Sequence, residues 1–476
     1  MGDNMKKIIF VLLLLMGLVA VVACNSDTQN IEGQKATDPA QTEDIEINTD
    51  ASDRVSEKIT EKATSRPRPT EPALDKDQSG DDEEETMQRE YTAKNFDDMK
   101  CMWLSQFDLS RIYCDGSVER EEASFRQLMA TVLDNVVNNG INTVILQVRP
   151  NADSMYPSEV YPPSAYVVGA YGKDFSYDAV AIILELAKER ELSIHAWINP
   201  LRAMTDTQIK AVPQKYAIRQ WYDDYSLNGK YIVKVGSNWY LNPAYSEVRE
   251  LILAGAEEIM QKYDFDGLHM DDYFYPTTDA SFDTSAYMQY RRNGGTLEIG
   301  DFRREALNKL VSGMYETVKK IDPAALYGIS PAGNYNTVYN SHYADVLTWC
   351  AEPGYIDYIC PQIYFGLEHA SFGFKKTAEV WQGYIKTDEV KMIVGMSLGK
   401  AQSGVDNYAG AGKDEWKNNK DVLKRCLEYT TELDRCVGVA YFCYQYFYDP
   451  ISAEPNSATA EERNNFVPLL CEISWK

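Results

Sequence analysis

Two adjacent carboxylates, Asp271 and Asp272, are the residues of this sequence best suited to acid–base chemistry. They close the segment YDFDGLHMDDYFYP, in which a strand-like run ends in an acidic pair. Side chains alternate along a strand, so His269, Asp271 and Tyr273 should share one face. Asp272 would point away in an ideal strand, but a bulge or turn at the strand end can aim both carboxylates at one pocket.

A third candidate acid, Asp153, follows another strand-like run in the segment QVRPNADSMYPS. Arg149 in the same segment can orient a carboxylate through two parallel hydrogen bonds. We predict that Asp271 acts as nucleophile or base and that Asp272 is the acid, with Asp153 as the alternative acid. The separation of the two carboxyl groups would decide between retention and inversion, and the sequence leaves that choice open.

Polar and aromatic side chains also follow other strand-like runs, in the segments HAWINPLR, WYLNPAYSEVR, DYICPQIY and YFCYQY. Aromatic rings can stack on the C–H faces of sugars, while amide and guanidinium groups bond to hydroxyls. The alternative is that many of these rings pack the rim of the fold. The predicted substrate-binding residues are Arg149, Asn151, Tyr156, Trp197, Asn199, Arg202, Asn242, His269, Tyr273, Gln362, Tyr364 and Gln445.

An alternation of strand-like and helix-like runs, beginning near Tyr91, must position these residues. The predicted strands span 100–107, 141–148, 192–199, 265–273, 326–330, 355–364, 391–398 and 438–444. Helical patterns are clearest at 121–138, 177–190, 246–263, 301–321 and 415–433. Eight strand-then-helix units are the number that closes an α/β (β/α)8 TIM barrel. The alternative, a doubly wound open sheet, lacks a Gly-rich phosphate fingerprint after the first strand.

Long predicted loops follow the second, third and fourth strands, over 149–176, 200–245 and 274–300. Loops of this length are uncommon unless they are functional. In a barrel they all rise from the C-terminal face, where active sites lie. This arrangement would bring the carboxylates and the candidate binding residues together.

Six segments in order resemble blocks of the glycosyl hydrolase-like 10 family: QVRPNADSMYPS, HAWINPLR, WYLNPAYSEVR, YDFDGLHMDDYFYP, YGISPAGN and DYICPQIY. The resemblance covers most of 99–445 and implies a barrel related to the alpha-amylase clan, usually in exported bacterial proteins. It also implies hydrolysis of a glycosidic bond. Asp271 takes the place of that clan's nucleophile, with His269 where the clan has Arg. The fifth strand ends in SPAGN without a carboxylate, so the clan's acid has no counterpart here.

The same acidic block looks like the D-G-x-D-x-D-x-E signature of chitinases, through Asp266, Gly267 and Asp271. Tyr273 occupies the acid position of that signature, which puts the chitinase mechanism in doubt. The prediction is therefore a glycosidase of unknown substrate, acting on a cell-envelope or extracellular saccharide. The alternative is a glycan-binding lipoprotein that has lost catalysis, because the fifth strand lacks its acid.

A metal-dependent hydrolase built on His195, His269, Asp271 and Asp272 is a third hypothesis. Only four His are present, and neither an HxH nor an HExxH pattern occurs. His195 is better explained as a core histidine, and we predict no metal and no cofactor. The net charge of −25 argues against nucleic-acid binding, because an acidic surface repels phosphate backbones.

The N-terminus has the pattern of an export signal. Lys6 and Lys7 precede an apolar run over 8–22, and VVAC at its end resembles a bacterial lipobox ending at Cys24. We expect a signal peptide over 1–24, a disordered acidic linker over 25–90 and the barrel over 91–476. The expected location is the cell membrane, lipid-anchored and outside the cytoplasm. The alternative is an uncleaved N-terminal anchor helix.

Lipidation of Cys24 can be tested by growing cells that express the full chain with a radioactive fatty acid. The wild type should incorporate label and Cys24→Ala should not, because a lipobox cysteine carries the acyl chains that give stable anchoring. An unlabelled wild type, or a Cys24→Ala variant that keeps its label, would refute the assignment.

Overall fold

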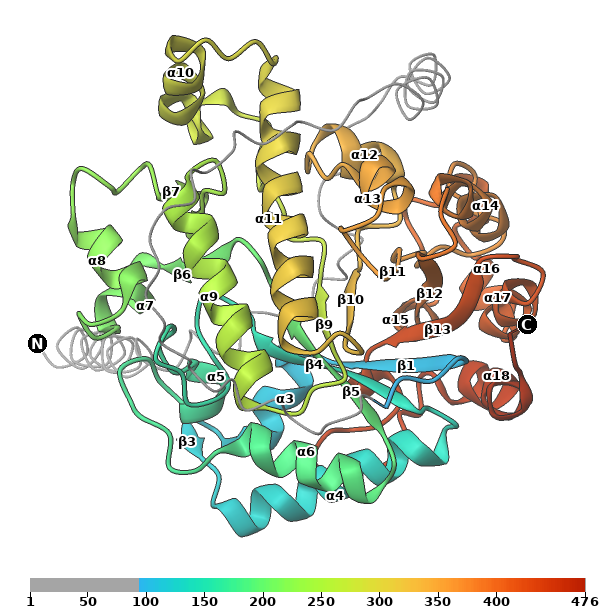
Figure 1. The fold of residues 1–476 in the computed structure, drawn as a ribbon. Helices are drawn as coiled ribbons and strands as arrows, with labels where there is room; N and C mark the ends of the chain where they lie inside the picture. The colour runs from blue at the N-terminus through green and yellow to red at the C-terminus, as the bar shows by residue number, and fades with distance from the viewer. Residues whose placement is uncertain (1–93, 476) are drawn as a thin grey trace, which may run out of the picture. The chain divides into compact units, whose positions relative to one another are not determined.

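The computed structural model describes residues 94–475. The predicted signal peptide, Cys24 and the predicted linker lie outside the described residues. Within the part that is described, eight parallel strands close into a barrel in the order β1-β13-β12-β11-β10-β9-β5-β4 (Figure 1). The predicted (β/α)8 barrel is confirmed, because each of the eight predicted strand regions contributes one barrel strand.

The barrel strands are short and the helices surround them (Figure 1). The strands are β1 (Met99–Leu104), β4 (Thr143–Arg149), β5 (Ser193–Ile198), β9 (Gly267–Met270), β10 (Leu326–Ile329), β11 (Tyr358–Ile359), β12 (Lys391–Ser397) and β13 (Cys436–Phe442). The longer helices are α3 (Gln106–Tyr113), α4 (Glu122–Asn138), α6 (Ala179–Glu189), α9 (Ser246–Lys262), α10 (Thr284–Arg292), α11 (Ile299–Ile321), α14 (Phe374–Tyr384), α17 (Val422–Thr430) and α18 (Ala460–Glu472). The shorter helices are α5 (Ala165–Val168), α7 (Asp206–Ala211), α8 (Ala217–Asp223), α12 (Tyr335–Asn340), α13 (Val346–Ala351), α15 (Gly399–Ser403) and α16 (Glu415–Asn418).

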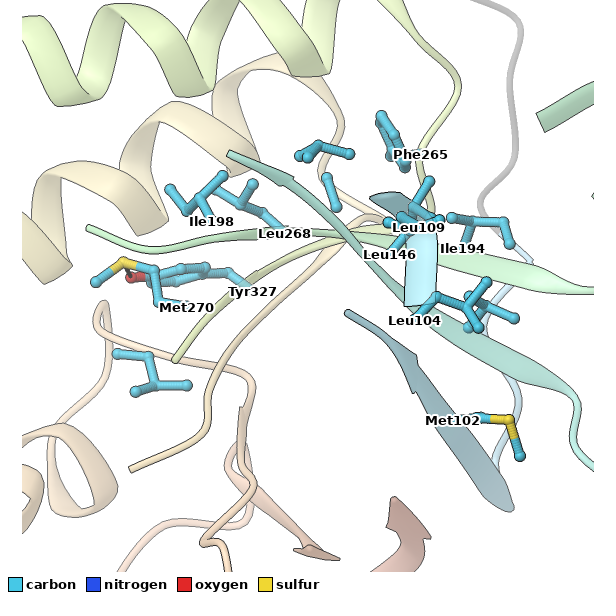
Figure 2. Close-up of a cluster of buried hydrophobic side chains, with 14 of the residues drawn as sticks. Met102, Leu104, Leu109, Leu146, Ile194, Ile198, Phe265, Leu268, Met270 and Tyr327 are labelled. Carbon is cyan, nitrogen blue, oxygen red and sulfur yellow. Dashed lines mark hydrogen bonds between the residues drawn. The ribbon is translucent and has the colours of Figure 1, made fainter. Parts of the chain in front are cut away.

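The strands are buried on both faces, as parallel strands covered by helices are. Met102 and Leu104 of β1 point outward into the large cluster between the strands and the helices, and Figure 2 shows Leu268 and Met270 of β9 in the same cluster. Trp103 of β1 belongs to a second cluster of buried side chains inside the barrel. This alternation determines which residues can reach the mouth of the barrel.

Several predicted elements differ from the structure. The loops predicted over 149–176 and 274–300 contain α5 and α10. The helix predicted over 415–433 is wrong as one element, because it is interrupted between α16 and α17 by an extended backbone at Asn419. The Glu415 side chain is held elsewhere, accepting the backbone N–H groups of Leu367 and Glu368. The loop predicted over 200–245 contains an antiparallel sheet, in the order β6 (Arg202–Thr205), β8 (Asn238–Leu241) and β7 (Ile232–Val235).

The loop after β9 is fastened to α11 by a buried ion pair. Arg303 donates to both carboxylate oxygens of Asp283, over 2.9 and 2.7 Å. The guanidinium also lies over the rings of Tyr275 and Tyr343. This contact fixes the segment that leads away from the acidic pair. Among residues 94–475, no helix combines the length and the apolar character needed to cross a membrane.

The closure between β13 and β1 can be tested at Gly438. A Cβ atom there would lie 2.0 Å from the Met99 carbonyl oxygen, so the two strands would have to separate. Gly438→Ala should lower the free energy of unfolding by about 1–3 kcal/mol or more, measured by urea denaturation.

Gly383 in α14 is the matched control, because a Cβ there meets nothing within 4 Å. Gly383→Ala should stabilise the protein by up to about 1 kcal/mol through helix propensity. Equal stability of the two variants would contradict the close approach of β13 to β1 at Gly438.

Candidate active site

Strand β9 directs His269 into the barrel and ends just before the acidic pair. The Trp103 indole N–H, from β1, donates to His269 Nε2 over 3.4 Å. His269 Nδ1 lies 2.9 Å from the hydroxyl of Tyr358 in β11. These partners come from strands on other sides of the barrel, so His269 is confirmed on the inward face. The alternation expected from the sequence therefore holds up to the end of β9.

A chain of hydrogen bonds continues from His269 through the barrel interior. The Tyr358 hydroxyl also contacts His195 Nδ1 over 3.0 Å, and His195 Nε2 contacts Asn95 Oδ1 over 2.9 Å. One proton arrangement satisfies every bond with neutral rings and also uses the Tyr358 proton: His269 donates from Nδ1, Tyr358 donates to His195 Nδ1, and His195 donates from Nε2 to the amide oxygen. Both imidazoles are therefore assigned as neutral.

Burial also favours neutral imidazoles. It lowers the pKa of His195 to about 4 and the pKa of His269 well below its usual range. All four ring nitrogens already have partners, so neither ring is arranged as a metal ligand. Within the described part of the chain, no group of three or more His, Cys, Asp or Glu side chains could hold a metal ion. His195 is a satisfied core residue, as its sequence context suggested.

Asp271 lies one residue beyond β9, with its carboxylate held by two N–H groups. The Trp197 indole donates to Oδ2 over 3.1 Å, and the backbone N–H of Tyr273 donates to Oδ1 over 3.2 Å. The side chain is only 2% exposed. Burial, followed by the charge of Asp272, raises the pKa of Asp271 well above its usual range, against the opposing effect of the two donors.

Asp272 is buried beside it. Burial raises the pKa of Asp272 to about 6, opposed in part by a hydrogen bond from the Gln362 side chain. Two interacting carboxyl groups titrate as a pair. The pKa of Asp272 is raised to about 6 and that of Asp271 well above its usual range, so the pair keeps a proton to a higher pH than ordinary carboxyl groups do. One proton on two carboxyl groups is the state that acid–base catalysis by such a pair requires.

Arg202 places a positive charge beside the pair. Its guanidinium lies 5.1 Å from the centre of the Tyr273 ring. The cation acts against burial and lowers the pKa of Asp271 and of Asp272. Four of the predicted binding residues are therefore brought into contact with the carboxylates or close enough to act on their charge: Trp197, Arg202, Tyr273 and Gln362.

Asp153 is engaged within its own loop. One oxygen accepts the Asn151 backbone N–H over 2.8 Å, and the other accepts the Tyr171 hydroxyl over 2.8 Å. The side chain is fully buried, and burial raises the pKa of Asp153. These contacts give Asp153 and Asn151 a part in shaping the loop after β4.

Several predicted binding residues make contacts that support the scaffold. Arg149 donates to the Tyr161 hydroxyl and to the Asn199 and Pro200 carbonyl oxygens. Asn242 donates to the Lys230 and Phe282 carbonyl oxygens and accepts the Ala244 backbone N–H. Tyr156 packs edge-on against Tyr263 and donates to a carbonyl of α9 over 3.5 Å.

Other predicted residues line the strand ends. Asn199 follows β5, and its Oδ1 accepts a hydrogen bond from Gln147 Nε2 over 2.7 Å. Tyr364 is stacked on Phe442 with ring centres 5.9 Å apart. The backbone N–H of Gln445 donates to Asp108 over 2.7 Å. These contacts give the residues defined positions at the end of the barrel where β9 carries its acids.

The residues predicted from the sequence do not include Trp103, Tyr358, Gln147 or Ser330. Trp103 lies within β1 and Tyr358 begins β11, and an aromatic residue in a strand is ordinarily part of the core. Gln147 and Ser330 are polar residues at strand ends, next to predicted site residues. These two residues could have been found from the strand register, because parallel barrel strands place residues at equivalent end positions at the same level.

The glycosyl hydrolase-like 10 family model matches residues 98–409. The chain belongs to this family. The match confirms the resemblance seen in the six sequence segments, and it contains both carboxylates and every predicted binding residue except Gln445.

Relatives of the chain carry glycosyl hydrolase names. Glycosyl hydrolase YngK of Bacillus subtilis (strain 168) is 33% identical over 336 residues, covering 67% of this chain and 62% of YngK. The alignment thus spans less than two thirds of that relative. Glycosyl hydrolase DigH of Escherichia coli (strain K12) is 27% identical over 385 residues, covering 75% of this chain and 86% of DigH.

The fold is shared with a solved structure, the PgaB (BpsB) glycoside hydrolase domain from Bordetella bronchiseptica. The TM-score is 0.51 at 12% identity, covering 77% of this chain and 98% of that domain. At this identity the likeness supports the barrel alone.

The effect of burying the Asp272 carboxylate on stability can be tested without a substrate. The pKa of Asp272 is raised from 3.8 to about 6 in the folded protein, so the folded state binds the proton more tightly than the unfolded state. Stability should therefore fall as pH rises from about 4 through about 6, and stay lower above that. Asp272→Asn removes this cost and should be more stable than the wild type at pH 8, on the order of 2 kcal/mol by urea unfolding.

The same comparison at pH 4 is the control, because the carboxyl is largely protonated there and the difference should shrink. If Asp272→Asn is less stable than the wild type at pH 8, the ionised Asp272 carboxylate does not destabilise the folded protein and the prediction is wrong.

Proposed function

We propose that this protein hydrolyses glycosidic bonds with Asp271 and Asp272 as its catalytic pair. The observation that carries the proposal is the buried carboxylate pair at the C-terminal end of β9, in which burial raises the pKa of both groups. A barrel strand end is where active sites of this fold lie. Membership in a glycosyl hydrolase-like family and the names of the relatives support the same reaction class.

In the reactive form of the pair we assign the negative charge to Asp271 and the proton to Asp272, and the share of this form falls as pH rises above the Asp272 pKa of about 6. Burial and the charge of Asp272 raise the pKa of Asp271 well above its usual range, which opposes this assignment. Both carboxylates accept N–H donors, from Trp197 and the Tyr273 backbone at Asp271 and from Gln362 and the Asp272 backbone at Asp272, so the donors do not separate the two roles. The assignment rests on position, because Asp271 continues the inward-facing alternation of β9.

In the reaction, Asp272 transfers its proton to the glycosidic oxygen as the bond from that oxygen to the anomeric carbon breaks. Asp271 either attacks the anomeric carbon or takes a proton from the water that attacks it. In the first case, water later hydrolyses the glycosyl ester and returns the proton to Asp272. In the second case, the proton that Asp271 has taken from water passes to Asp272 before the next turnover. In both cases one water is consumed, and each carboxyl group has then returned to its starting state.

The proposed substrate is a poly- or oligosaccharide of the cell envelope or of the extracellular space, and the proposed location is the outer side of the cytoplasmic membrane. The support for both is the export signal and the lipobox-like VVAC ending at Cys24. Stacked rings such as Tyr364 on Phe442 suit a saccharide ligand. The proposed anchor is the acylated Cys24.

A catalytically inactive glycan-binding protein is the second candidate. Ser330 directly follows β10, the fifth barrel strand, so no carboxylate stands where the alpha-amylase clan carries its acid. This candidate requires binding without product release, whereas the buried pair with its raised pKa values favours catalysis.

A digestion screen separates the two candidates. The substrate is the soluble fraction of bacterial envelope polysaccharide after partial acid hydrolysis, called here the soluble envelope glycans. The wild type should release new reducing ends, and Asp271→Asn should release them about a hundredfold to ten-thousandfold more slowly, because the attacking carboxylate is gone. Product release is measured by mass spectrometry and a reducing-end assay.

Asp153→Asn tests the alternative acid in the same assay, and thermal unfolding shows whether each variant is folded. Near-normal turnover by a folded Asp271→Asn variant would end the assignment. Binding of the soluble envelope glycans without any release would favour the second candidate.

A further inference from the structure

Three residues lie side by side at the ends of neighbouring strands. Strand β9 lies between β5 and β10 in the barrel, with Ile198 and Ile329 both paired with Met270. The next residue on each strand is therefore Asn199, Asp271 and Ser330. The backbone N–H of Ser330 still donates to the Met270 carbonyl over 2.7 Å, so the pairing continues to this level.

Alternation points these three side chains to the same side. Trp197 and His269, two residues earlier on β5 and β9, point into the barrel. The side chains two residues later share their direction. Asn199 is 1% exposed and Ser330 is fully buried, which places both at the same depth as Asp271.

Asn199 and Ser330 each keep one polar atom without a hydrogen-bond partner among the described residues. These atoms are Asn199 Nδ2 and Ser330 Oγ. The Cys360 thiol beside Ser330 is only a weak partner. A buried polar group without a partner costs free energy, so such groups call for an explanation. Here both lie in the same layer as the proposed nucleophile.

The surroundings fix these residues in place. Gln147 Nε2 holds Asn199 Oδ1 over 2.7 Å, which leaves Nδ2 as the outstanding donor of that amide. Gln362 Nε2 holds the Ser330 carbonyl oxygen over 3.1 Å, and the Gln362 side chain also bonds to Asp272. Other atoms of the two residues are therefore held in place. Gln147 holds Asn199, and Gln362 links Ser330 to Asp272.

We propose that Asn199 and Ser330 form a hydroxyl-binding subsite beside Asp271. An amide N–H can donate to a hydroxyl oxygen, while a serine hydroxyl can accept its proton. The nearby negative charge of Asp271 disfavours an anion at this position and favours a neutral O–H group. The occupant is a hydroxyl of the sugar that Asp271 attacks, or the water that replaces the leaving group. This inference rests on the proposed function, and it adds Ser330 to the site.

Ser330→Ala is the decisive variant, with the soluble envelope glycans as the probe. Removing this buried hydroxyl should leave the melting temperature nearly unchanged or raise it, because only the weak contact with the Cys360 thiol is lost within the protein. The variant should nevertheless lose about tenfold or more in kcat/KM, because the reacting ligand loses a partner. Loss of activity without loss of stability separates ligand binding from a structural role.

Ser193→Ala is the matched control. Ser193 is the first residue of β5, and its Oγ is likewise buried and without a partner, but it lies at the opposite end of the barrel. This variant should keep the kcat/KM of the wild type. If Ser330→Ala is as active as Ser193→Ala, the proposal is overturned, while the wild-type activity leaves the proposed function intact.

Binding to the Asp271→Asn background identifies the source of the hydroxyl. Affinity electrophoresis through gels containing the soluble envelope glycans measures the apparent Kd. If a sugar hydroxyl occupies the subsite, adding Ser330→Ala weakens binding about tenfold or more. If water occupies it, binding is unchanged and the kinetic loss is in kcat alone.

The same gels apply to the wild type if it releases no product. In that case the proposed catalysis fails, and the subsite is judged by binding alone. Weaker binding by Ser330→Ala than by Ser193→Ala would then support it, and equal binding would overturn it.

Discussion

Two negative charges cannot be buried side by side without a cost, and this constraint shapes the mouth of the barrel. Asp271 and Asp272 follow one another on the chain and are both almost inaccessible. Burial and the charge of Asp272 raise the pKa of Asp271, and burial raises the pKa of Asp272, so both groups hold a proton more tightly than exposed carboxyl groups do. Arg202 and the N–H donors moderate the cost without removing it. A site that spends stability in this way is typical of catalytic centres.

The scaffold around the pair is built mostly from uncharged hydrogen-bonding groups. Trp197 positions Asp271, Gln362 bonds to Asp272, and His269 is held neutral below them by Trp103 and Tyr358. Neutral donors can hold a carboxylate in place without forming an ion pair that would suppress its basicity. The full ion pair of the loop, Arg303 with Asp283, lies on the segment that leads away from the acids.

Much of this could be predicted from the sequence because it depends on local periodicity. Alternation placed His269 and Asp271 on the inner face, and eight strand-like runs predicted the closed barrel. Contacts across the barrel carry no such signal. The partners of Arg149 and Asp153 depend on how a loop folds back on itself, so both looked as available for ligands as Trp197. The break at Asn419 depends on tertiary contacts of Glu415, which override helical periodicity.

Asn95 links the segment before β1 to the end of the barrel opposite the carboxylates. It precedes β1, yet it accepts the buried N–H of His195 and donates to the carbonyl oxygens of Asp266 and Ala324. The backbone N–H of Lys94 donates to the Asp266 carboxylate as well. The residues that pack against the barrel therefore begin upstream of β1. A proteolytic cut after Asn95 would separate the buried His195 from the acceptor of its N–H. It would also loosen the packing of the barrel interior below the carboxylates.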